Sequence, residues 1–100
     1  MRRIKGLKVS SIIKDEFMIP YNVSSSSLAK GIGVSVSRVN KIINDEIKVD
    51  AEMSIRLGRF FGVSDKYFLN LQNNIDIREA KSRYKKSISK ITSVVNKNNL

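Results

Sequence analysis

The feature that most constrains the fold is a pair of short helical patterns on either side of Gly33. The first pattern follows a polar run at 24–27, which can supply an N-cap oxygen, and it predicts a helix over about residues 27–32. Ser35 can cap the second pattern, which predicts a helix over about residues 36–43. In each helix the apolar residues share one face: Leu28, Ala29 and Ile32 in the first, and Val39, Ile42 and Ile43 in the second.

These two helices have the dimensions of a helix-turn-helix. Ala29 is small enough to let the first helix pack closely on the second, and Gly33 permits the sharp turn between them. A helix that enters the roughly 12 Å wide major groove of DNA needs an apolar face toward its own domain and a hydrogen-bonding face toward the bases. The 36–43 helix is divided in this way, because Ser37, Asn40, Lys41 and Asn44 share its other face.

The polar side chains suit different parts of DNA. Asn40 can make a bidentate contact to adenine, whereas Arg38 or Lys41 can reach guanine or phosphate. The first turn of the 27–32 helix offers backbone N–H groups suited to a phosphate. A polar stripe alone is more often a solvated face, so the surrounding pattern carries the prediction. The predicted DNA-binding set is Ser26, Ser27, Ser35, Ser37, Arg38, Asn40, Lys41, Asn44 and Lys48.

Helical spacing recurs on both sides of this motif. Apolar residues predict a helix over about 9–18, which Pro20 closes. They predict another over about 51–61, which Asp50 caps and Gly62 ends. We expect an inward stripe on this second helix, formed by Met53, Leu57, Phe60 and Phe61.

Two further segments complete the predicted fold. Ser64 can cap a fifth helix, which carries Phe68, Leu71 and Ile75. From Ile77 onward, apolar residues at alternating steps of three and four predict an amphipathic helix. No stretch alternates with period two for long enough to argue for a sheet. We therefore expect an all-α protein with a helix-turn-helix domain and N-terminal arm over residues 1–76 and a basic helical tail over 77–100.

The net charge limits the class of partner. With 19 Lys and Arg against 9 Asp and Glu, the chain carries +10 and favours a polyanion, either nucleic acid or an anionic membrane surface. No run approaches the roughly 18 apolar residues of a membrane span, and no signal-peptide core is found, so we expect a cytoplasmic protein without a membrane partner. The absence of Cys and His argues against an enzyme, a metal site or a cofactor.

Residues 81–100 contain six basic and no acidic side chains, and so supply six of the ten net charges. A basic amphipathic helix can lie on DNA, on anionic lipid or against a second chain. We expect this one to pack on its own domain or on a dimer partner. We expect the small acidic group of Asp45, Glu46 and Asp50 to cap and solvate its loop rather than to repel phosphate.

The segment LAKGIGVSVSRVNKIIN, from Leu28 to Asn44, resembles the helix-turn-helix of XRE-type, phage-repressor-like regulators. Over about residues 7 to 80 the chain also resembles the HigA/VapI family of addiction-module antitoxins, through Asp15 to Pro20, Glu52-Met53, Arg56-Leu57, Gly62 and Phe68 to Gln72. The resemblance implies a five-helix, lambda-repressor-like domain that forms a homodimer. It also implies binding of double-stranded operator DNA of its own operon and neutralisation of a toxin, usually a RelE-like ribonuclease.

The sequence departs from that family at one four-residue run and at three single positions. Lys8-Val9-Ser10-Ser11 replaces a frequent His-Pro-Gly-Glu, Val36 replaces Arg, Asp45 replaces Gly, and Phe68 replaces Trp. The change at Val36 bears on the operator sequence, because that position can touch DNA, whereas Phe68 should still fill an aromatic core site. Two alternatives stay open: a stand-alone phage-type repressor without a toxin, and a toxin-binding module with weak DNA binding.

Overall fold

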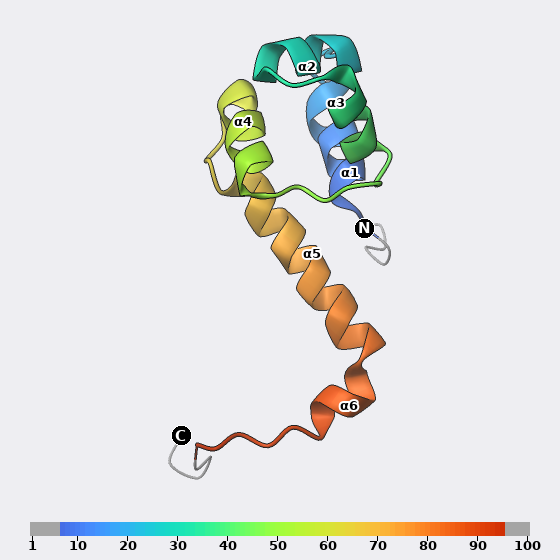
Figure 1. Ribbon diagram of the computed structural model, residues 1–100, viewed down its shortest axis with the longest axis vertical. Helices are drawn as coiled ribbons and strands as arrows, with labels where there is room; N and C mark the ends of the chain where they lie inside the picture. Colours follow the sequence, from blue (N-terminus) through green and yellow to red (C-terminus); the bar gives the residue numbers. More distant parts are fainter. Residues whose placement is uncertain (1–6, 96–100) are drawn as a thin grey trace.

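The computed structural model describes residues 7–95. Within that range no strand is present, which confirms the all-α prediction. Figure 1 shows α1 to α4 gathered into one body, from which α5 projects. The elements in chain order are α1 (Val9–Ile12), the π-helical segment η1 (Ile13–Met18), α2 (Ser25–Ile32), α3 (Val36–Ile43), α4 (Ala51–Phe61), α5 (Tyr67–Arg83) and α6 (Lys85–Ser89).

The first helix covers the predicted range of 9–18, but its first part is α-helical and its second part is π-helical. The α-helical turn of α1 passes into η1, where the backbone N–H of Ile19 donates to the carbonyl oxygen of Lys14 at 2.9 Å. A hydrogen bond that spans five residues is the mark of a π-helix. Pro20 follows directly in the turn, as predicted, because it has no N–H with which to continue the helix.

α2 and α3 form the predicted helix-turn-helix. α2 begins two residues earlier than expected, because the side chain of Ser24 accepts a hydrogen bond from the backbone N–H of Ser27. Gly33 has φ 76°, the left-handed conformation that the sharp turn requires. Ala29 is buried, as close packing between the two helices needs. The predicted range of α3, 36–43, is confirmed.

The beginning and end of α4 are also confirmed. The carboxylate of Asp50 accepts a hydrogen bond from the backbone N–H of Met53 at 2.9 Å, and Gly62 ends the helix with φ 76°. Asp50 therefore acts as the N-cap that the sequence predicts.

The predicted start of the fifth helix is wrong. α5 begins at Tyr67, and the hydroxyl of Ser64 accepts a hydrogen bond from the backbone N–H of Lys66 at 3.0 Å, within a turn before the helix. α5 then continues to Arg83, because no Gly or Pro interrupts it. The predicted division between residues 76 and 77 falls inside this continuous helix.

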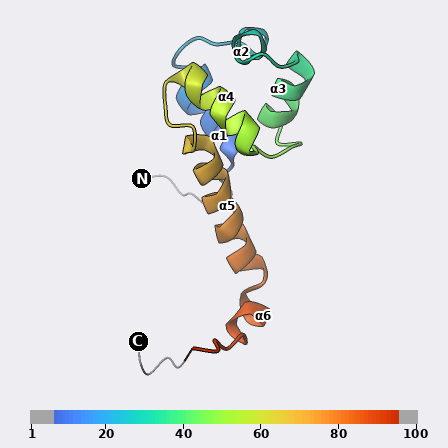
Figure 2. The same cartoon turned by 60° about the vertical axis from the view of Figure 1, so that its left-hand side comes forward.

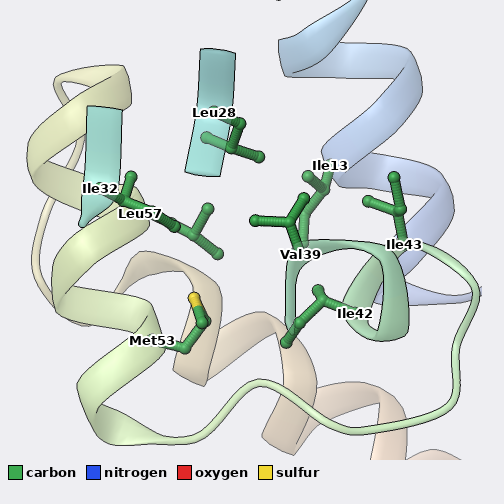
Figure 3. A pocket seen from close by; sticks show the side chains of 8 residues that line it. All are labelled: Ile13, Leu28, Ile32, Val39, Ile42, Ile43, Met53 and Leu57. Carbon is green, nitrogen blue, oxygen red and sulfur yellow. The ribbon is translucent and has the colours of Figure 1, made fainter. Parts of the chain in front are cut away.

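One apolar core lies beneath the helix-turn-helix. α1 and η1, α2, α3, α4 and the first half of α5 all contribute side chains to it. Figure 3 shows how Leu28 of α2 and Val39 of α3 point toward Met53 and Leu57 of α4. The cavity between them measures about 10 Å³, which is no more than a single water requires, so this core is not a ligand site.

An aromatic cluster joins η1, α4 and α5. The ring of Phe17 lies 5.1 Å from that of Phe61 and 5.0 Å from that of Phe68, which is fully buried and fills the expected aromatic core site. The prediction that Phe60 faces inward is wrong, since 39% of it is exposed. Neighbouring residues of a helix diverge by about 100°, and it is Phe61 whose ring packs against Phe17 and Phe68.

Up to residue 95, the chain beyond α5 does not return to the body (Figures 1 and 2). α6 follows a break at Tyr84, and every side chain from 81 to 95 is exposed. Of the two packings expected for the tail, the one on its own domain is therefore excluded for residues 81–95. α5 extends past the last apolar surface of the body, and Ile77 on α5 and Ile88 on α6 are exposed. Packing against a dimer partner stays a prediction. Helical structure ends at Ser89, short of the predicted positions Ile91 and Val95.

Candidate nucleic-acid interface

The N-terminus of α2 is closed by a reciprocal pair of hydrogen bonds. The hydroxyl of Ser24 accepts from the backbone N–H of Ser27 at 3.1 Å, and the hydroxyl of Ser27 accepts from the backbone N–H of Ser24 at 2.9 Å. The predicted site residue Ser27 is thus occupied in the cap. Ser26 is exposed in the first turn, where backbone N–H groups point out of the helix.

α3 has the two faces that the sequence predicts. Its hydroxyl cap comes from Ser35, which accepts from the backbone N–H of Arg38 at 3.1 Å. Val39 and Ile42 are buried in the core, as Figure 3 shows. The opposite face presents exposed side chains of Ser37, Asn40, Lys41 and Asn44, all of which belong to the predicted site. The structure therefore brings these four residues together on one accessible helix face.

Arg38 is only partly exposed because it leans against α4. Its Nη2 lies 3.4 Å from Oε1 of Glu52, in the first turn of that helix. Glu52 also accepts a hydrogen bond at 2.9 Å from Nε of Arg56, whose Nη1 donates to the carbonyl oxygen of Ile32 at 2.7 Å. The guanidinium groups of Arg56 and Arg38 together hold the pKa of the Glu52 carboxyl below its usual value.

Neither Glu52 nor Arg56 belongs to the predicted DNA-binding set. Their spacing of four residues, acid before base, indicates an ion pair on one helix, and that signal was in the sequence. The contact between Glu52 and Arg38 joins residues 14 positions apart. It depends on how α4 packs beside α3, so no local sequence pattern predicts it.

Lys48 lies in the loop between α3 and α4, where α5 holds it. Its Nζ is 3.3 Å from a carboxylate oxygen of Asp76, although the side chain is 72% exposed. The same loop is fixed by the backbone N–H of Val49, which donates to the side-chain oxygen of Gln72 at 3.0 Å. Gln72 in turn donates to Asp76 at 3.1 Å. α5 therefore sets the position of the loop that carries Lys48.

Two of the three residues in the acidic group beside α3 have partners for their side chains. Asp50 caps α4, and a carboxylate oxygen of Asp45 lies 3.3 Å from Nζ of Lys8. Asp45 also adopts φ 63° two residues after the end of α3, at the position where the antitoxin family often has glycine. These contacts agree with the predicted structural role of the group.

Among residues 7–95, no helix is long and apolar enough to cross a membrane. Over the same residues, no three acidic side chains gather in a geometry that would bind a metal ion.

The fold, together with the buried and exposed faces of α3, defines a helix-turn-helix protein. Residues 15–68 match the family described as "Helix-turn-helix". Virulence-associated protein I of Dichelobacter nodosus is 35% identical over 69% of this chain and 64% of its own length, so the chain spans somewhat less than two thirds of that relative. Antitoxin HigA-1 of Vibrio cholerae is 31% identical over 84% of this chain and 81% of its own length.

Solved structures show the same likeness. Pseudomonas aeruginosa antitoxin HigA, solved with the higBA promoter, superimposes with a TM-score of 0.80 at 31% identity, over 89% of this chain and 98% of that one. The chain belongs to the helix-turn-helix family and, within it, to the HigA/VapI-type antitoxins. This is a family of non-enzymatic DNA-binding regulators.

Proposed function

We propose that this chain is a cytoplasmic antitoxin that represses its own toxin-antitoxin operon and neutralises a RelE-like ribonuclease toxin. The observation that carries the DNA-binding part is the division of α3, whose polar face is exposed while Val39 and Ile42 are buried. P. aeruginosa HigA, which has the same fold, is solved with the higBA promoter. That likeness supports operator DNA as the partner of α3.

In the proposed complex, a two-fold dimer inserts two copies of α3 into successive major grooves, roughly 34 Å apart. Asn40 and Arg38 contact base edges, with Ser37 and Lys41 beside them. Ser26, Asn44 and Lys48 contact the phosphate backbone, while Ser27 and Ser35 hold the N-termini of α2 and α3 through their caps. To do so, Lys48 exchanges the partly buried carboxylate of Asp76 for a phosphate, which costs little because the lysine itself is 72% exposed and ion pairs near the surface are weak.

Similarity to HigA antitoxins supports the toxin-binding part of the proposal. A RelE-like ribonuclease is the toxin class that the resemblance of residues 7 to 80 implies. The projecting α5 and α6 offer exposed apolar side chains to a second chain, among them Ile77, Tyr84 and Ile88. Their exposure supports a contact with a dimer partner or with the toxin.

The test is a titration of the purified protein against its own upstream promoter DNA and against scrambled DNA of equal length, at two salt concentrations. Specific binding predicts a large preference for the promoter that survives the higher salt. Equal binding to both DNAs, lost together as salt rises, would mean that only the +10 charge attracts the protein to phosphate. That result would contradict the proposal and favour the toxin-binding module.

Three variants separate base contacts from phosphate contacts. Asn40→Ala should lower the preference for the promoter by about fivefold to a hundredfold, the usual discrimination of a bidentate base contact. Lys48→Ala should weaken binding to both DNAs alike. Asn70→Ala is the matched control, since Asn70 is an exposed helical asparagine on α5. If the control and Asn40→Ala behave the same, α3 does not contact the bases.

Co-expression with the product of a small neighbouring gene tests the toxin part. The proposal predicts a stable complex in which the ribonuclease is inactive. A preference for the promoter without any such partner would favour the stand-alone repressor instead.

A further inference from the structure

A chain of hydrogen bonds connects all three helices around the turn. Arg56 of α4 donates to the carbonyl oxygen of Ile32 at the end of α2, and its Nε donates to Glu52 at 2.9 Å. The other oxygen of Glu52 reaches Nη2 of Arg38 on α3 at 3.4 Å. The Glu52 carboxylate is therefore anchored to the framework of the motif by the shorter contact and extends from it to Arg38.

The position of this carboxylate is unexpected for a protein that binds a polyanion. Glu52 is about half exposed and close to the proposed DNA-facing helix, where its negative charge repels phosphate. An acidic residue in the first turn stabilises a helix through its favourable interaction with the helix dipole. That role alone would not require contact with Arg38. Arg38 has the opposite difficulty, because a long arginine near DNA is attracted to phosphates of any sequence.

We propose that Glu52 is a positioning residue that holds Arg38 for base recognition. The inference rests on the operator binding proposed above. A guanidinium has five N–H donors in a planar fork, and a carboxylate occupies only part of that fork. Glu52 fixes one part of the Arg38 fork, which leaves the remaining donors in a restricted orientation for the O6 and N7 atoms of guanine. Glu52 thereby increases sequence discrimination and decreases binding to DNA of unrelated sequence.

A double-mutant cycle tests this inference, with Glu52→Gln, Arg38→Ala and the double variant titrated against promoter and scrambled DNA. Glutamine keeps an acceptor oxygen for Arg56 but removes the charge that holds Arg38. Glu52→Gln should reduce the ratio of promoter to scrambled affinity by about tenfold, which is close to the discrimination that one base contact provides. Its affinity for scrambled DNA should rise, and the salt dependence of that binding should steepen by about one phosphate contact. In the Arg38→Ala background, Glu52→Gln should leave the ratio unchanged.

Glu46→Gln is the matched control, because it makes the same change of net charge at an exposed site that has no ion pair with Arg38. It should leave the ratio of promoter to scrambled affinity at the wild-type value. Thermal unfolding shows whether each variant is folded in the assay. Glu52 is about half exposed and Arg38 is partly exposed, so loss of their contact should cost the fold little. If Glu52→Gln lowers the ratio equally with and without Arg38, or does not lower it, the positioning role is refuted.

The wild-type titration distinguishes failure of the positioning role of Glu52 from failure of operator binding. If the wild type prefers its promoter but Glu52→Gln matches the wild type, only the positioning role fails. If the wild type shows no preference, operator binding fails, and the inference that rests on it fails as well.

Discussion

Gly58 lies in the middle of α4, where helix propensity and tertiary packing predict opposite effects of one substitution. In an exposed helix, replacing glycine with alanine stabilises by about 1 kcal/mol. Gly58 is buried, however, and a Cβ at this position would lie 2.5 Å from the carbonyl oxygen of Ser64 and 3.1 Å from that of Val63. We therefore expect Gly58→Ala to destabilise the protein.

The size of the destabilisation in Gly58→Ala depends on the atoms that the added methyl group would contact. Both obstacles are backbone atoms of the turn before α5, so neither can rotate aside as a side chain would. The turn or the helix has to move, and added volume in a packed interior typically costs about 1–3 kcal/mol. After the gain in propensity, we expect a net loss of up to about 2 kcal/mol in the free energy of unfolding. For a domain of this size, each kcal/mol lowers Tm by about 4–8 °C.

Thermal unfolding followed by circular dichroism measures this effect. Gly31→Ala is a useful comparison, because the Cβ there would meet the ring of Phe60, a partly exposed side chain that can move. We expect Gly31→Ala to lower Tm less than Gly58→Ala does. A rise in Tm for Gly58→Ala would refute the argument, since it would show that propensity outweighs the contact between α4 and the turn before α5.

Two further predictions concern the surface of the domain. Asp45→Gly should raise the free energy of unfolding in urea by about 0.5–1 kcal/mol, because glycine removes the cost of a left-handed φ of 63°; Asp45→Ala should lower it, and equal effects would contradict this reason. Arg59 donates two hydrogen bonds of 3.1 Å to Asp65 and lowers the pKa of that carboxyl. The pair therefore stabilises the fold above the ordinary Asp pKa of about 3.9 and loses this effect as pH falls through the lowered pKa. Urea unfolding should show Asp65→Asn to be less stable than the wild type at pH 7, and this difference should shrink as the pH falls below the ordinary Asp pKa; a difference that keeps the same size would count against the ion pair.

Local sequence patterns determined much of the secondary structure. The spacing of apolar residues and the caps Ser35 and Asp50 located α3 and α4, because capping and amphipathic periodicity act within a few residues. The start of α5 was misplaced because Ser64 makes a local hydrogen bond within a turn rather than at a helix cap. The exposure of Phe60 was missed because a continuous apolar run does not show which of two neighbouring rings faces inward.

The candidate site also has features that the sequence predicts and features that depend on tertiary packing. The sequence by itself placed Ser37, Asn40, Lys41 and Asn44 on one accessible face, because helical periodicity settles which residues lie side by side. Only the tertiary structure brought Glu52 to Arg38 and tied the Lys48 loop to α5, because these contacts join residues 14 and more positions apart. It also decided that the tail leaves the body, since an amphipathic pattern shows that a helix has an apolar face but not whether its own domain extends far enough to cover that face.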